Sequence, residues 1–181
     1  MGEPALVARI AMLYLQSFDY HATNALPYRK FDYVTLSTWL RSIQSLDPLS
    51  GYPLFSAARV YAEVADAAKQ RVMLDLIYDQ FLFDPDRRWP EAAQAAMIAK
   101  HRLKDLLFAL KFAHAIGSFA KAADVPLWAK QMGLFILEDM NEIDAARIML
   151  GGLIANGQVN DPVEIQFLQR RLKLLESRSQ P

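Results

Sequence analysis

The chain has 181 residues, of which 53% are apolar and 22% are charged, so it can form one globular domain with a substantial buried core. Its 20 basic residues equal its 20 acidic residues, and this balance argues against nucleic acid as the main partner. It contains no cysteine, which excludes disulfides, thiolate metal sites and a cysteine nucleophile.

The N-terminal part of the chain combines a predicted helix at about 4–18 with an irregular aromatic stretch from Phe18 to Tyr33. Loops longer than about a dozen residues in compact domains tend to be functional or flexible. Two interpretations of this stretch are open. Its aromatic side chains cap the end of the fold, or some of them, such as Tyr28 and Phe31, contact a partner.

Apolar residues recur at helical spacing through the rest of the chain, whereas the alternating pattern of strands is almost absent. We therefore predict an all-α protein with about nine helices. Their expected ranges are 4–18, 32–46, 52–64, 67–81, 89–102, 105–119, 126–139, 142–156 and 161–177.

Prolines and short polar residues mark the expected helix ends. Pro90 is expected to open a helix, because proline inside a helix removes a backbone hydrogen bond. Asp105 and Asn141 are expected to cap the helices that follow them, and Asp161 to Glu164 has the pattern of a capping box. The pair Gly151-Gly152 falls inside an expected helix, where it predicts close packing against a neighbour.

Two octapeptides, Leu46–Pro53 (LDPLSGYP) and Phe83–Pro90 (FDPDRRWP), share an aspartate, two prolines and an aromatic residue at the same positions. Between such proline clusters lie pairs of helical patterns, which indicate a helix–turn–helix unit repeated at roughly 36 to 41 residues. We therefore predict that both octapeptides are turns between units. The oxygen-ligand spacing of a calcium loop is absent around Asp84 and Asp86.

These units resemble degenerate tetratricopeptide repeats (TPRs). Trp89 followed by alanines matches the first helix of that repeat, and Ala109 with Ala113 matches the second. The chain is also similar to proteobacterial proteins of this divergent type. The resemblance implies a right-handed superhelix of helix–turn–helix repeats, a TPR-like α-solenoid, as one domain over 1–181. The N-terminal helix and cap would occupy 1–32, the repeats 33–160 and a closing helix 161–177.

In such stacks the first helix of each unit lines an inner groove in which partners lie. That groove would hold an apolar helical segment of a partner, the N-terminal helix of the chain itself, or a second copy. The resemblance places six residues there: Ala57, Val60, Gln94, Met97, Gly133 and Ile136.

We therefore expect a non-catalytic protein–protein interaction or scaffold module that uses no cofactor. One alternative is a helical enzyme or small-ligand binder that uses His101 and His114, although these histidines lack metal-ligand spacing. Another is the soluble part of a membrane-anchored envelope protein whose anchor lies outside this chain. Because no signal-peptide pattern is visible, a cytoplasmic location is the default expectation, and a periplasmic or membrane-tethered one applies if the chain is a fragment.

Overall fold

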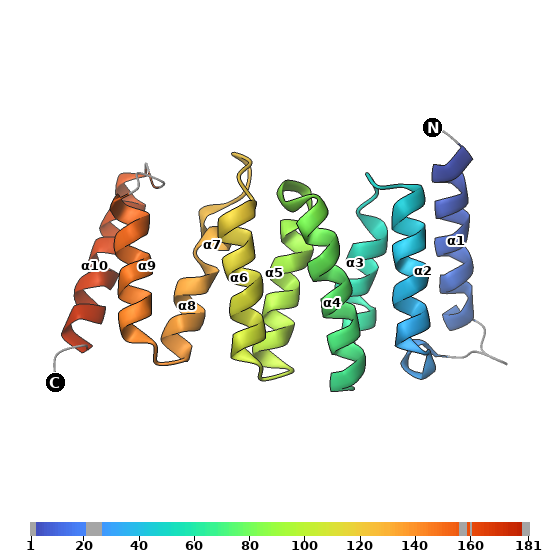
Figure 1. Ribbon diagram of the computed structural model, residues 1–181, viewed down its shortest axis with the longest axis horizontal. Helices are drawn as coiled ribbons and strands as arrows, with labels where there is room; N and C mark the ends of the chain where they lie inside the picture. Colours follow the sequence, from blue (N-terminus) through green and yellow to red (C-terminus); the bar gives the residue numbers. More distant parts are fainter. Residues whose placement is uncertain (1–2, 21–26, 156–158, 160, 179–181) are drawn as a thin grey trace.

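The fold is a row of helices that stand side by side in chain order, with the two termini at opposite ends (Figure 1). The structure is a computed structural model that describes residues 3–20, 27–155, 159 and 161–178. Within these ranges it contains ten α-helices, two short 3₁₀ helices and no β-strand. The all-α prediction is therefore confirmed, and the expected number of helices was one short.

The N-terminal half contains α1 (Glu3–Tyr20), η1 (Tyr28–Lys30), α2 (Tyr33–Leu46), α3 (Tyr52–Arg59), η2 (Tyr61–Glu63) and α4 (Ala67–Phe83). The C-terminal half contains α5 (Pro85–His101), α6 (Leu106–Phe119), α7 (Leu127–Lys130), α8 (Met132–Asp139), α9 (Ile143–Ala155) and α10 (Pro162–Arg178).

Four of the described helices begin at an aspartate whose side chain accepts hydrogen bonds from free backbone N–H groups of the first turn. Asp32 does so at the start of α2, Asp66 at the start of α4, Asp105 at the start of α6 and Asp161 at the start of α10. Such caps typically contribute about 1 kcal/mol each. The predicted capping role of Asp105 is therefore confirmed.

Pro90 does not open a helix but lies inside α5, which begins at Pro85. Asp84 is both the C-cap of α4 and the N-cap of α5. The segment 85–88, which was predicted to be a turn, is therefore the first turn of α5. Pro85 suits the first helical position, because a backbone N–H at that position has no acceptor within the helix and proline lacks this N–H. The two similar octapeptides thus differ, since Pro48 lies in a turn before α3.

Two expected helices are each interrupted. The predicted helix 52–64 ends as α3 at Arg59 and continues as η2, and the predicted helix 126–139 is divided at Gln131. Gln131 is buried, and its Nε2 donates to Glu164 Oε1 of α10 at 3.3 Å. This residue therefore connects the break between α7 and α8 to the last helix.

Asn141 ends α8 rather than capping α9. It has a left-handed φ of 60°, and the N–H groups of Asn141 and Glu142 donate back to the carbonyls of Glu138 and Leu137. This pattern is a Schellman ending, which asparagine tolerates. The expectation for Gly151-Gly152 was also wrong, because a Cβ added to either glycine would meet no atom of the described residues within 4 Å, apart from the backbone of its own helix.

In the part of the chain that the structure describes, the buried apolar side chains form two clusters. The larger one extends from Ala8 in α1 to Ile136 in α8. The smaller one joins α8, α9 and α10, and Arg171 of α10 supports it through a two-pronged ion pair with Glu138 of α8. The smaller cluster contains Leu134, Leu137, Ala146, Leu150, Val159, Leu168 and Leu175.

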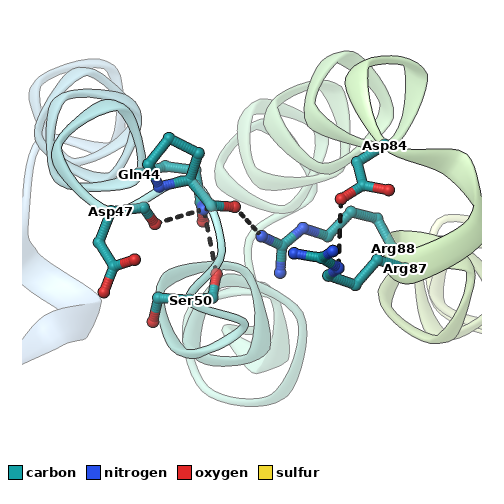
Figure 2. A network of polar contacts seen from close by, with 7 residues as sticks. Gln44, Asp47, Ser50, Asp84, Arg87 and Arg88 are labelled. Carbon is teal, nitrogen blue, oxygen red and sulfur yellow. Dashed lines mark hydrogen bonds and ion pairs between the residues drawn. The ribbon is translucent and has the colours of Figure 1, made fainter. Parts of the chain in front are cut away.

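A polar junction connects the two octapeptides (Figure 2). Gln44 Nε2 donates to the carbonyls of Asp47, Pro48 and Ser50 at 3.0–3.1 Å, which fixes the turn between α2 and α3. Arg88 of α5 is buried, and its Nη2 donates to the same Pro48 carbonyl at 2.6 Å. The turn between α2 and α3 is therefore held both by Gln44 of α2 and by Arg88 of α5.

Candidate functional site

The best candidate site is an apolar groove between α1, α2 and the segment before α2, at the N-terminal end of the row. We name it the aromatic groove. It has a volume of about 320 Å³, and its lining residues are Tyr14, Leu15, Phe18, Phe31, Asp32, Thr35, Leu36 and Trp39. Ligand pockets are commonly concave, mainly apolar and equipped with a few polar groups, and this groove has that composition.

Aromatic rings at the rim contact one another and still face solvent. The Tyr14 ring stacks on Trp39 with centroids 6.1 Å apart, and Phe18 meets both Tyr14 and Phe31 edge to face. Tyr14, Phe18 and Trp39 are 54%, 41% and 42% exposed. Exposed aromatic side chains at a groove are the residue type that most often dominates binding energy at protein interfaces.

The polar residues of the groove belong to the cap of α2. Asp32 accepts hydrogen bonds from the backbone N–H of Val34 and Thr35 and from the Thr35 hydroxyl. The hydrogen bond from Thr35 is the main reason why the pKa of Asp32 lies below its ordinary value. The groove thus carries one carboxylate that stays ionised at neutral pH, next to an otherwise apolar surface.

Contacts with residues later in the chain hold the segment before α2 in place. Tyr28 packs edge to face on Tyr61 at 6.3 Å, and Lys69 Nζ donates to the Arg29 carbonyl. Tyr28 therefore supports the packing interpretation of the aromatic stretch, whereas Phe31 lines the groove. Residues 21–26 of that stretch lie outside the described residues.

The six residues expected on an inner groove do not share one environment. Ala57, Gly133 and Ile136 are buried, Gln94 is half-buried, and Val60 and Met97 are 40% and 43% exposed. A Cβ at Gly133 would lie 3.1 Å from His114 Cδ2 and from Met149 Cε, so this glycine permits close packing of α8 against α6 and α9. Only Gln94, Val60 and Met97 are accessible to a partner.

The histidines proposed for an enzymatic alternative, His101 and His114, are exposed on α5 and α6. Across the described residues there is no group of three histidine, aspartate or glutamate side chains placed to hold a metal ion. Within the same ranges, no helix has the length and apolar content needed to span a membrane.

A second hollow, of about 420 Å³, lies beside the polar junction and is lined by Arg41, Gln44, Gln80 and Arg88 among others. Its two arginines already have acceptors, Asp79 for Arg41 and the Pro48 carbonyl for Arg88. Because these cations serve the fold, the aromatic groove is the better candidate.

Comparison of the chain with protein-family models, with curated proteins and with solved structures found no match. The candidate site therefore rests on its own geometry.

Sequence reasoning placed Phe31 near a contact surface but missed Tyr14 and Trp39. These two residues are 25 positions apart and meet only because α1 packs against α2. The available signal was an excess of apolar residues in α1, where large side chains occupy all sides of the helix.

Proposed function

We propose that this protein is a non-catalytic protein-interaction module that binds an apolar segment of a partner protein in the aromatic groove. The groove supplies three part-exposed aromatic rings on two well-packed helices, and this one observation carries the proposal. We further propose that the row of helices forms a right-handed superhelix of TPR-like repeats, as the resemblance of the octapeptides and of the Trp89 helix suggests.

The partner segment that suits this groove is a helix with large apolar side chains at positions i and i+3 or i+4. Such a helix places two anchors on one face, as in other helix-in-groove complexes. A lysine or arginine at the end of that segment would complement the Asp32 carboxylate, which is ionised at neutral pH.

A displayed library of amphipathic helical peptides, selected on the full chain, tests this proposal. We expect selected peptides to lose about tenfold or more in affinity for the Phe18→Ala/Trp39→Ala variant, because truncation of aromatic anchors is costly. The Trp128→Ala variant is a matched control, since Trp128 is also about half exposed but lies on α7.

A Val60→Glu/Met97→Glu variant distinguishes peptide binding in the aromatic groove from peptide binding on the surface that the repeat resemblance favours. Both side chains are exposed, so the charges should be tolerated by the fold. Peptides that bind the groove should retain their affinity for this variant. If peptides lost their affinity for this variant but bound the Phe18→Ala/Trp39→Ala variant fully, the binding surface would lie on α3 and α5 and not in the aromatic groove.

A further inference from the structure

A third hollow lies where α1 passes the end of α2 and the start of α3, at the N-terminal end of the row (Figure 1). We name it the charged pocket, because Arg9 and Asp47 both line it. Its volume is about 370 Å³, which is within the usual range of pockets that hold small molecules. It shares no lining residue with the aromatic groove, so the two sites can be occupied independently.

The buried side chains that line the charged pocket are all apolar. Ala8 and Met12 of α1 and Ile43 of α2 are each 3% exposed, and Pro53 of α3 is buried as well. Leu13 adds an exposed apolar side chain to the lining. A small apolar group that enters this pocket loses contact with water, which favours its binding.

Arg9 brings a positive charge that the fold does not use. No acidic residue lies three or four positions away in α1, where the residues are Ala5, Leu6, Met12 and Leu13. Across the described residues, the Arg9 guanidinium forms no ion pair and donates no hydrogen bond. Its donors are therefore available to a ligand.

Asp47 brings a negative charge from the turn after α2. Its backbone carbonyl accepts from Gln44, but its carboxylate points away from that polar junction (Figure 2). The carboxylate interacts with Arg88 electrostatically without an ion pair, and it forms none with Arg9 or with any other described residue. The pocket thus holds two opposite charges that do not neutralise each other by direct contact.

We propose that the charged pocket binds a free apolar α-amino acid. Such a ligand is a zwitterion, so its carboxylate can pair with Arg9, its ammonium group with Asp47, and its side chain can pack on the buried apolar residues. Ion pairs next to apolar walls are screened less than ion pairs on an open surface. This activity is separate from the binding of a partner segment in the aromatic groove.

Two hydroxyl groups of the pocket add hydrogen-bond donors. Gln16 Nε2 donates to the Tyr52 hydroxyl at 2.5 Å, and the Tyr52 backbone N–H donates to Ser50 Oγ at 3.3 Å. Each hydroxyl is the acceptor in these bonds, so its own hydrogen remains for a ligand oxygen. The carboxylate of an amino acid supplies such oxygens, whereas a simple organic cation would not.

Isothermal titration calorimetry of the full chain with L-leucine and with L-phenylalanine tests the proposal. We expect saturable binding of at least one of them. The N-acetyl derivative lacks the ammonium charge and the amide derivative lacks the carboxylate, so each should bind about tenfold more weakly or less. Absence of saturable binding for both amino acids, or equal binding of either derivative, would overturn the proposal.

Variants assign the two charges. Arg9→Gln and Asp47→Asn should each weaken binding of the amino acid about tenfold, whereas Arg170→Gln on the distant helix α10 should not change it. Asp47→Asn should leave the affinity of the N-acetyl derivative unchanged, because that ligand has no ammonium group to lose a partner. The melting temperature of each variant shows that a loss of binding is not a loss of folding.

The Phe18→Ala/Trp39→Ala variant separates this inference from the proposed function. It should bind the amino acid with unchanged affinity, because neither residue lines the charged pocket. Loss of amino-acid binding in that variant, with full binding to Arg9→Gln, would contradict the assignment. Failure of the amino-acid titrations would leave peptide binding in the aromatic groove unaffected.

Discussion

The buried guanidinium of Arg88 donates a hydrogen bond of 2.6 Å to the carbonyl of Pro48, forty positions earlier in the chain. Pro48 and Arg88 belong to the two similar octapeptides, so the motifs that resemble each other in sequence also touch in space (Figure 2). Because the same carbonyl accepts from Gln44, the bond ties the α2–α3 turn to the start of α5.

Removal of this bond should destabilise the protein substantially. We expect Arg88→Met to lower the free energy of unfolding by about 1.5 to 3 kcal/mol, the usual range for a buried hydrogen bond to a charged group. The neighbouring variant Arg87→Met is the control. Arg87 is half exposed and, among the described residues, forms an ion pair with Asp84 at 3.4 Å, so its loss should cost about 0.5 kcal/mol or less. Urea unfolding of both variants measures the difference, and equal losses would contradict the structural role of Arg88.

Glu91 should make stability depend on pH. Burial is the main reason why the pKa of Glu91 lies above its ordinary value of 4.5, and its Oε2 atom is buried without a hydrogen-bond partner among the described residues. A raised carboxyl pKa means that the folded state binds the proton more tightly than the unfolded state. The contribution of Glu91 to stability is therefore present below about pH 4.5 and is lost as the pH rises through the folded pKa.

The Glu91→Gln variant should remove that part of the pH dependence. We expect its melting temperature to exceed that of the natural chain at pH 7, and the gap to narrow towards pH 4.5. Thermal melts across this window measure the effect. A gap that is constant with pH would show that ionisation of Glu91 is not its cause.

The glycines of α9 and α6 should respond in opposite ways to alanine. Gly152 has open space around the position of a Cβ, so Gly152→Ala should raise the free energy of unfolding by about 0.5 to 1 kcal/mol. A Cβ at Gly117 would lie 3.1 Å from the backbone carbonyl oxygen of Lys130. Because that backbone has to move, we expect Gly117→Ala to destabilise the protein in the same chemical denaturation assay.

The ion pair between Arg171 and Glu138 should control the docking of α10. Glu138 is only 10% exposed, and Arg171→Ala would leave its carboxylate without the cation that pairs with it in two places. We expect faster amide hydrogen exchange in α9 and α10 and unchanged exchange in α4, because the two regions belong to different apolar clusters. Arg170→Ala, on the exposed side of α10, is the control and should leave exchange unchanged.

Much of the helical architecture could be predicted because its signals are local. Apolar periodicity located the helices, and aspartates such as Asp105 marked their starts. The conformation of the two similar octapeptides was harder to predict, because the three residues at the centre of each one decide whether it forms a turn or a helix. Leu49-Ser50-Gly51 favours a turn, whereas Asp86-Arg87-Arg88 continues as helix, with Asp86 accepting hydrogen bonds from the backbone of Lys121 and Ala122.

The candidate site was less accessible to prediction because it depends on which helices meet. The repeat resemblance assigns Ile136 to a surface, yet the packing of α8 buries it to 3% exposure. Tyr14 and Trp39 form a contact surface only after α1 has docked on α2. Neither fact has a signature within a single helix.

Because Asp84 serves both α4 and α5, no spare residue separates these two helices. One inserted residue there would rotate α5 by about 100° relative to α4 and carry every later helix with it. The turn from Asp47 to Ser50 is constrained in another way, because the side chains of Gln44 and Arg88 bind its carbonyls and an added residue would break those hydrogen bonds. Insertions should therefore be poorly tolerated at both junctions, through lost hydrogen bonds between α2 and α3 and through rotation of the following helices between α4 and α5.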